Sequence, residues 1–265
     1  RTILPPMLPM FFAHFATQHV FTLALVLFVV LSTTVVGSPL MSEDSLLTLV
    51  VLSDSHNGHH HVTVPPGDIL IHCGDFSDSG SETEVRRFNR WLATLPHKHK
   101  LVISGNMDGL GLDPSRSGAE HAARVRSLLT QATYLEHESV TVEGLHVFGS
   151  PFTPEFVGGF QLRPDADPTS RHSPAHLWRS IPSNVDVLIT HGPPRGVLDR
   201  SSSGVVCGDV ELAKRVLEVR PSYHFFGHVH HSHGHAYQDG IHYYNCAVYN
   251  GQAATVVQIP RVRSR

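Results

Sequence analysis

Short apolar runs alternate with amphipathic segments from residue 46 almost to the C-terminus, a pattern typical of an α/β domain. Runs of four to eight residues that are mostly apolar and are bounded by polar or turn residues predict buried strands. On this criterion the predicted strands are residues 46–53, 68–73, 101–104, 185–190, 223–226 and 253–259. The dipeptides Glu143-Gly144 and Asp239-Gly240 separate further apolar runs and predict two hairpins.

Helical spacing appears in three places between these strands. Ser81 and Glu84 form a capping-box pattern, and apolar residues follow at intervals of three or four. Residues 119–129 and 210–219 also have one apolar face and predict helices. Residues 153–173 are rich in Pro and Gly and predict a long surface loop, a kind of segment that often carries function.

The N-terminal part differs from the rest, because residues 20–36 are uncharged and mostly apolar. This length is near the lower limit for a membrane span and within the range of a signal-peptide core. Three interpretations stay open: a gene-model extension upstream of a start at Met41, a secretory signal, and a membrane anchor. In each case we expect residues 1–44 outside the fold and residues 45–261 as one domain.

Composition excludes several classes of protein. The chain has 265 residues, of which 41% are hydrophobic and 16% charged, so it can bury a full core and is neither disordered nor a coiled coil. The formal net charge is −3, whereas proteins that bind duplex nucleic acid usually carry an excess of positive charge, so the composition does not indicate such a protein. Three cysteines do not make a disulfide framework and favour a reducing cytoplasmic location; secretion or anchoring through residues 20–36 is the alternative.

Histidine is abnormally frequent, with 22 copies, and several of them follow predicted strands together with Asp and Asn. Ligands of open α/β sheets bind beyond the carboxyl ends of strands. Oxygen and imidazole donors suit Mn, Fe or Zn better than a thiolate site does. The ends of five predicted strands carry such donors, namely Asp54 and His56, His72 and Asp75, Asn106 and Asp108, His191, and His228 and His230.

Other residues of the same types have simpler interpretations. We expect the histidine run at residues 59–61 to be a solvated loop rather than an adventitious metal site, and His97 and His99 to lie at the surface. Cys73 ends an apolar run and is expected to be a small core residue, not a ligand. Stacking on a nucleobase and packing of the long loop onto the domain are both open for Phe152, Phe156 and Phe160.

The strings DxH, GD, GNxD, HG and GHxH follow one another in this order between Asp54 and His230. This series resembles the calcineurin-like metallophosphoesterase superfamily, and the resemblance extends over residues 46–260. Residues 65–80, 149–154 and 190–194 are similar to the metallophosphoesterase-domain-containing proteins of the fetal-brain type, which resemble class III cyclic-nucleotide phosphodiesterases. The resemblance implies a four-layer α/β/β/α sandwich of two mixed sheets flanked by helices, with a dinuclear metal site at one edge.

The resemblance also implies roles for the candidate residues. One divalent ion would be held by Asp54, His56, Asp75 and His230, and a second by Asp75, Asn106, His191 and His228. Mn²⁺ is the first choice, with Fe and Zn as alternatives, and a hydroxide bridging the two ions would be the nucleophile. Asp75, Asn106 and His191 are the residues assigned to catalysis.

The implied activity is hydrolysis of a small phosphoester. A phosphodiester is the preferred substrate, and cyclic nucleotides are included. A phosphomonoesterase and a catalytically weak metal-binding scaffold are the alternatives. One residue departs from the superfamily pattern, because Met107 stands where a histidine usually protonates the leaving oxygen. General-acid help is worth about 10²–10⁴ in rate, so its loss favours good leaving groups and diesters.

Overall fold

The computed structural model describes residues 46–111, 119–163, 167 and 173–261, and the predicted N-terminal segment, residues 1–44, lies outside them. Two large mixed sheets make up the domain. The first has the strand order β13-β1-β2-β3-β4 and contains β1 (Leu46–Leu52), β2 (Ile69–His72), β3 (His99–Val102), β4 (Thr133–Tyr134) and β13 (Thr255–Pro260). The second has the order β11-β12-β10-β9-β6-β5 and contains β5 (Glu138–Val142), β6 (Leu145–Ser150), β9 (Val187–Thr190), β10 (Tyr223–Phe226), β11 (Gly234–Gln238) and β12 (Ile241–Asn245).

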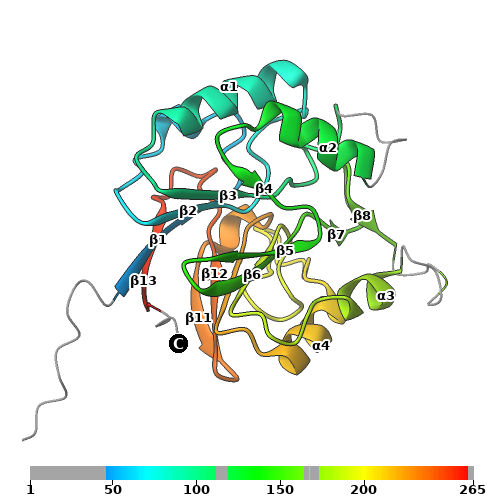
Figure 1. Ribbon diagram of the computed structural model, residues 1–265. Coiled ribbons are helices and arrows are strands. Elements are labelled where there is room, and N and C mark those ends of the chain that lie inside the picture. Colours follow the sequence, from blue (N-terminus) through cyan, green and yellow to red (C-terminus); the bar gives the residue numbers. More distant parts are fainter. Residues whose placement is uncertain (1–45, 112–118, 164–166, 168–172, 262–265) are drawn as a thin grey trace, which may run out of the picture. The chain divides into compact units, whose positions relative to one another are not determined.

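Helices cover the outer face of each sheet (Figure 1). Next to the first sheet lie α1 (Glu82–Ala93) and α2 (Ala119–Leu128), and next to the second lie α3 (Pro174–Arg179) and α4 (Val210–Val219). The smaller elements are the paired strands β7 (Thr153–Pro154) and β8 (Gln161–Leu162) and the 3₁₀ turns His59–His61 and His230–Ser232.

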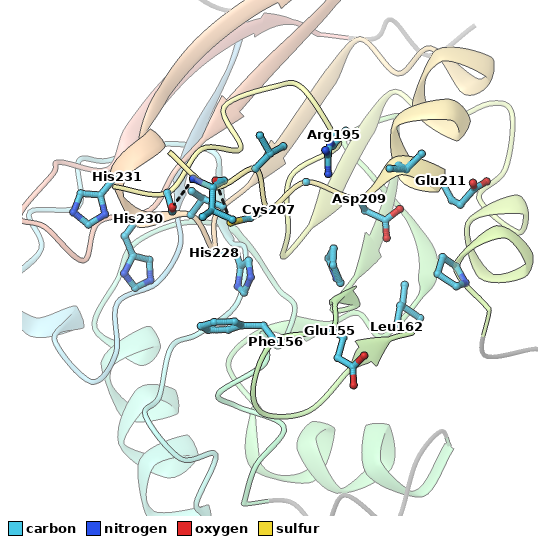
Figure 2. Close-up of a pocket in the computed structure, with 18 of the residues that line it drawn as sticks. Glu155, Phe156, Leu162, Arg195, Cys207, Asp209, Glu211, His228, His230 and His231 are labelled. Atoms are coloured by element: carbon cyan, nitrogen blue, oxygen red, sulfur yellow. Dashed lines mark hydrogen bonds between the residues drawn. The ribbon is translucent and has the colours of Figure 1, made fainter. Parts of the chain in front are cut away.

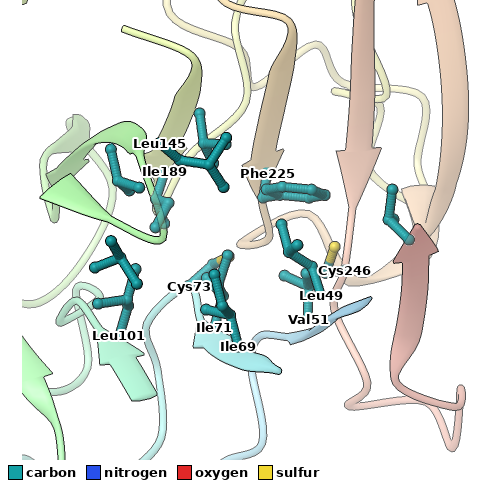
Figure 3. Packing of buried hydrophobic residues seen from close by; sticks show 14 of the residues in the cluster. Leu49, Val51, Ile69, Ile71, Cys73, Leu101, Leu145, Ile189, Phe225 and Cys246 are labelled. Atoms are coloured by element: carbon teal, nitrogen blue, oxygen red, sulfur yellow. The ribbon is translucent and has the colours of Figure 1, made fainter. Parts of the chain in front are cut away.

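Three hydrophobic clusters separate four layers and follow from the alternation of side chains along the strands. On β1, Leu49 and Val51 point between the two sheets, where they meet residues such as Ile189 and Phe225 of the second sheet (Figure 3). The intervening Val50 faces α1 and α2. A third cluster joins the second sheet to α3 and α4. The predicted four-layer sandwich is confirmed.

Parallel pairing brings the chemistry-bearing strand ends together. β1, β2 and β3 are parallel to one another, as are β6, β9, β10 and β12. At the carboxyl end of β1, Ser53 pairs with Ala247 beyond β12, so the two sheets are joined at this edge. The segments that follow β1, β2, β3, β9 and β10 therefore meet at one place.

Both predicted hairpins are confirmed. Glu143 and Gly144 have φ of 50° and 81°, and Asp239 and Gly240 have φ of 55° and 81°. Positive φ at both central residues gives the turn the twist that the flanking strands need. The predicted cap of α1 is also present, because the Ser81 N–H donates to Glu84 Oε2 at 3.0 Å.

Several predictions for individual residues were wrong or incomplete. His59 is fully buried, packing on Phe88 and Trp91 of α1, so the solvated loop is restricted to His60 and His61. His97 is also buried instead of lying at the surface. His59 presents its ring to the aromatic side chains of α1, a contact that a loop prediction based on polarity does not recognise.

Cys73 is buried between the sheets, as expected. The short elements β4 and α3 were not predicted, since two and six residues are too few for a periodic signal. No helix in the part of the chain that the structure describes is long and apolar enough to span a membrane.

Candidate metal centre

All seven candidate ligands lie together beyond the strand ends. Asp54 and His56 follow β1, Asp75 follows β2, and Asn106 comes from the segment after β3. The second sheet supplies its residues after β9 and β10, namely His191, His228 and His230. Each strand end supplies only one or two of these residues, so the distances between the candidate ligands depend on how the two sheets pack.

One group consists of Asp54, His56 and His230. His230 Nε2 lies 3.2 Å from Asp54 Oδ1 and 3.4 Å from His56 Nε2. Ligand atoms of these three residues all lie within 4.8 Å of one another. Two imidazole nitrogens and one carboxylate oxygen facing a common point are donors that fit a divalent transition metal.

A second group is centred on the side-chain oxygen of Asn106. This oxygen lies 3.0 Å from His191 Nε2 and 2.9 Å from His228 Nδ1. An amide oxygen and two imidazole nitrogens again converge on one point. The donor set fits a second divalent ion.

Asp75 lies between the two groups. Its Oδ2 is 3.7 Å from His56 Nε2 and 3.4 Å from His191 Nε2. Its Oδ1 accepts the backbone N–H of Met107 at 2.8 Å, which fixes the plane of the carboxylate. The free oxygen therefore faces a histidine of each group.

Neighbouring acceptors orient two of the imidazoles. His191 Nδ1 lies 2.9 Å from the carbonyl oxygen of Cys73, which can only accept, so Nδ1 carries a proton. Nε2 is the nitrogen that faces the site and would bind a metal once its own proton is lost. His56 Nδ1 lies 3.2 Å from Asp78 Oδ1, which favours the same tautomer there. Asp54 Oδ2 accepts the His228 N–H at 2.8 Å, leaving Oδ1 for the site.

The electrostatics favour a cation. Burial alone would lower the pKa of His191, but Asp75 and Asp54 outweigh it and raise that pKa to about 9. Burial opposes ionisation of Asp54, yet its contacts with His230 and His191 hold the pKa of this carboxyl below its usual value. In the absence of a metal the site thus attracts a proton to His191. A divalent ion would compete for the same negative potential, so metal uptake would release that proton.

The backbone at the site is unusual. Asp54, His56, Asp75 and His228 have φ of 56°, 40°, 53° and 65°, the left-handed region that L residues rarely adopt. Close approach adds a second constraint, because a Cβ at Gly105 would come within 2.3 Å of Asp75 Oδ1. The glycine in the GN string is therefore required by space and not by flexibility.

Asp108 has a part in the site that sequence reasoning did not assign. It is fully buried, and its carboxylate accepts N–H groups from Gly105 and Ser77, both at 2.9 Å. These contacts tie the segment that carries Asn106 to the segment that carries Asp75. The GNxD string contained Asp108, but only the fold shows what its side chain holds.

Comparison with known proteins is consistent with this geometry. A profile of calcineurin-like phosphoesterases matches residues 44–232, most of the chain. The chain belongs to the calcineurin-like phosphoesterase family. Members of this family carry out metal-dependent phosphoester hydrolysis, which agrees with the candidate ligand clusters found in the structure.

Similarity to individual proteins extends over 207 or 208 residues in two relatives. The chain is 39% identical over 207 residues to human metallophosphoesterase domain-containing protein 1, covering 70% of this chain and 61% of the relative. It is 38% identical over 208 residues to a UPF0046 protein of Caenorhabditis elegans, covering 75% of this chain and 69% of the relative. The matched region thus spans about two thirds of the length of these relatives.

Among solved structures, the phosphopantetheinyl hydrolase of Mycobacterium tuberculosis superposes with a TM-score of 0.52 at 17% identity, covering 77% of this chain and 90% of that one. At this identity the likeness shows the fold alone.

Two cavities flank the ligand set of this calcineurin-like phosphoesterase. The larger has a volume of about 990 Å³ and includes His228 and His230 in its wall (Figure 2). The smaller has a volume of about 400 Å³ and is lined in part by His56 and Tyr249. Each cavity therefore has candidate ligands in its lining, His228 and His230 in the larger and His56 in the smaller.

Packing onto the domain, one of the two interpretations left open above, is observed for two of the three phenylalanines. Phe152 and Phe160 contact each other with ring centroids 5.7 Å apart, and they pack on His137 and His121. These two hold the loop against the domain. Phe156 is 75% exposed and lies 6.0 Å from the ring of His228, beside the metal centre.

Proposed function

We propose that this chain hydrolyses phosphodiesters with two divalent ions, Mn²⁺ being the first choice. The position of Asp75 is the observation that carries the proposal. Its free oxygen faces His56 of one ligand group and His191 of the other, the place where a carboxylate can serve two ions at once.

The ligand assignment follows the two groups. One ion would be held by Asp54, His56, Asp75 and His230, and the other by Asp75, Asn106, His191 and His228. When bound, two such ions lower the pKa of a coordinated water and stabilise charge on the phosphoryl oxygens. The chain's own part is positioning: the Cys73 carbonyl sets the His191 tautomer, and the Met107 N–H sets the Asp75 plane.

Two features favour a diester over a monoester. Met107 offers the site only its backbone N–H, and Asp75 already accepts it, so this position supplies no proton to a leaving oxygen. The two cavities give each ester group of a diester a place of its own, one beyond His228 and one beyond His56. Small diesters, cyclic nucleotides among them, are the substrate class that fits.

The test compares two substrates that share one leaving group. The full chain is loaded with Mn²⁺ and assayed with bis-p-nitrophenyl phosphate and with p-nitrophenyl phosphate. We expect metal-dependent cleavage with a higher kcat/KM for the diester. Preference for the monoester would contradict the proposed substrate class. Absence of cleavage of both by the metal-loaded chain would contradict hydrolysis and favour a metal-binding scaffold.

A matched pair of variants tests the site itself. Asp75→Asn keeps the shape and removes the charge, and its loss of activity should exceed the about 10- to 100-fold that outer-shell partners of metals typically cost. Asp239→Asn makes the same change in a hairpin turn, where Asn tolerates the positive φ, and should keep wild-type activity. Wild-type turnover in Asp75→Asn would overturn the two-ion arrangement.

A further inference from the structure

The larger cavity is lined by several segments that are far apart in the sequence. Residues 154–156, Leu162 and residues 173–175 contribute to the lining, as do residues within 195–211, and the cavity reaches His228 and His230 (Figure 2). In this view Phe156 and Leu162 lie on one side of the space, with Cys207 and Arg195 on the other. Its volume of about 990 Å³ is at the upper end of the range for small-molecule sites.

Apolar side chains are exposed on both walls. Phe156 is 75% exposed and Val205 is 60% exposed, and each belongs to a segment that lines the cavity. An exposed phenylalanine next to a metal centre leaves a large apolar surface in water, which a ligand could bury. Phe156 lies edge-on to His228 with an interplanar angle of 84°, so a group bound at the ions would reach its ring.

Hydrogen bonds hold the segment on which Phe156 lies. The Phe156 N–H donates to Gln161 Oε1 at 2.7 Å, and Gln161 Nε2 donates to the carbonyl of Val157 at 2.5 Å. On the opposite wall, the Val205 N–H donates to Ser201 Oγ at 3.1 Å. The two exposed apolar side chains are therefore pre-positioned, which lowers the entropy cost of binding a ligand between them.

The carboxylates of the lining are already engaged. Asp209 accepts Trp178 Nε1 at 3.0 Å and caps α4 through the N–H of Leu212 at 2.8 Å. Glu211 pairs with Lys214 at 2.6 Å. Glu155, the third carboxylate of the lining, lies 3.7 Å from Arg163 Nε. The exposed Arg195 also lines the cavity, so the cavity presents apolar surface together with a positive charge to a ligand.

We propose that this cavity binds the organic group of the phosphoester and that Phe156 selects aromatic groups there. The inference rests on the proposed function, since it assumes that the phosphoryl group lies at the metal centre. A flat ring would lie against Phe156 in an offset-stacked or edge-to-face arrangement. The smaller cavity beside Tyr249 takes the other, smaller ester group.

The test measures binding without turnover. Phenylphosphonate and methylphosphonate have the same anionic head and differ only in the group that would enter the cavity. Each is titrated calorimetrically into the full chain loaded with Mn²⁺. We expect phenylphosphonate to bind at least about tenfold more tightly, which corresponds to about 1.4 kcal/mol.

Variants identify the cavity that is responsible. Phe156→Ala should remove most of the tenfold preference and leave methylphosphonate affinity unchanged, while Phe156→Leu should retain part of the preference. Tyr237→Ala, which removes an aromatic ring that is 63% exposed on β11, should behave as wild type. Because Phe156 is exposed, its replacement leaves the core intact, and equal Mn²⁺ content and equal thermal unfolding verify this.

Three results would overturn the inference. The first is equal affinity of the wild type for the two phosphonates, or binding of neither. The second is an unchanged preference in Phe156→Ala. The third is loss of the preference in Tyr249→Ala but not in Phe156→Ala, which would assign the aromatic group to the smaller cavity. A chain that discriminates the phosphonates but cleaves no diester would contradict the proposed function and keep the cavity assignment.

Discussion

Gly227 has no room for a side chain, and this makes a sharp test of the metal centre. A Cβ added at Gly227 would come within 2.0 Å of Asp54 Oδ2 and 2.1 Å of Ser53 Oγ. Ordinary contact needs more than 3 Å, so in Gly227→Ala the Asp54 carboxylate has to move by about 1 Å. Asp54 cannot do so and still accept the His228 N–H at 2.8 Å and face His230 Nε2 at 3.2 Å.

The cost can be worked out from these contacts. Overpacking typically costs about 1–3 kcal/mol, and a lost hydrogen bond to a charged group costs about 1.5–3 kcal/mol. We therefore expect Gly227→Ala to lower the free energy of unfolding by about 2.5–6 kcal/mol. A displacement of about 1 Å at a reacting centre can also cost about 10² in rate, so hydrolysis should fall at least that far.

Gly192 provides the matched control. It also adjoins a candidate ligand, His191, but the nearest atom to its added Cβ is Thr153 Cγ2 at 3.4 Å, an ordinary contact. Gly192→Ala should therefore keep its Mn²⁺ affinity and its activity. Urea unfolding, calorimetric titration with Mn²⁺ and cleavage of bis-p-nitrophenyl phosphate are compared for the two variants. Equal damage in both, or wild-type metal binding by Gly227→Ala, would refute the reasoning.

Two further predictions concern proton transfer and pH. Met107→His keeps the backbone N–H that Asp75 accepts and adds a proton donor, so we expect faster cleavage of diesters with poor leaving groups. No change with both ions bound would show that another group already donates. Burial lowers the pKa of His224 to about 3, against an ordinary value of about 6.5. Between these values only the unfolded chain binds the proton, so stability is present at neutral pH and falls as pH drops below about 6.5. For this histidine, each pH unit in that range lowers the free energy of unfolding by about 1.4 kcal/mol. Urea unfolding at pH 7.5, 6 and 5 gives the free energy of unfolding at each pH, and this free energy should fall less with decreasing pH in His224→Gln than in the wild type. An equal fall in both proteins would contradict this prediction.

The fold could be predicted wherever pattern and local chemistry agreed. The helix at residues 210–219 was predicted with its observed bounds, because Asp209 caps it and Leu212, Val216 and Val219 form one buried face. Strands β1 and β10 gave equally clear apolar runs. Burial of His59 and His97 could not be predicted, since both lie outside the predicted strands and no local pattern shows that they enter the core, where burial lowers the pKa of each.

The candidate site was predicted as a set of residues but not as a geometry. The strings at the strand ends predicted seven candidate side chains, the structure brings these together, and parallel pairing explains why they meet. Contacts between segments distant in the sequence could not be derived from the strings. Asp108 holds Ser77, and Asp78 lies against His56. Phe156 lies beside His228 at the edge of the metal centre, in a loop that the contact between Phe152 and Phe160 holds against the domain. Such tertiary contacts are not visible in the sequence.

The strained backbone of the site is sustained by the strands beneath it. Left-handed residues cost about 1–3 kcal/mol each and persist only where the surroundings over-determine them. After β1 ends, the N–H groups of Asp54, His56 and Asn57 donate to the carbonyls of Gly74, Asp75 and Phe76 at 2.9, 3.0 and 3.1 Å. The two segments thus continue to pair beyond the sheet, and this pairing sets the positive φ of Asp54, His56 and Asp75. Since these bonds lie in the backbone, the donor atoms are positioned before any ion arrives, and binding energy is not spent on ordering them. Rigid placement of this kind explains how a site built from loops of two sheets can hold oxygen and nitrogen donors at fixed distances.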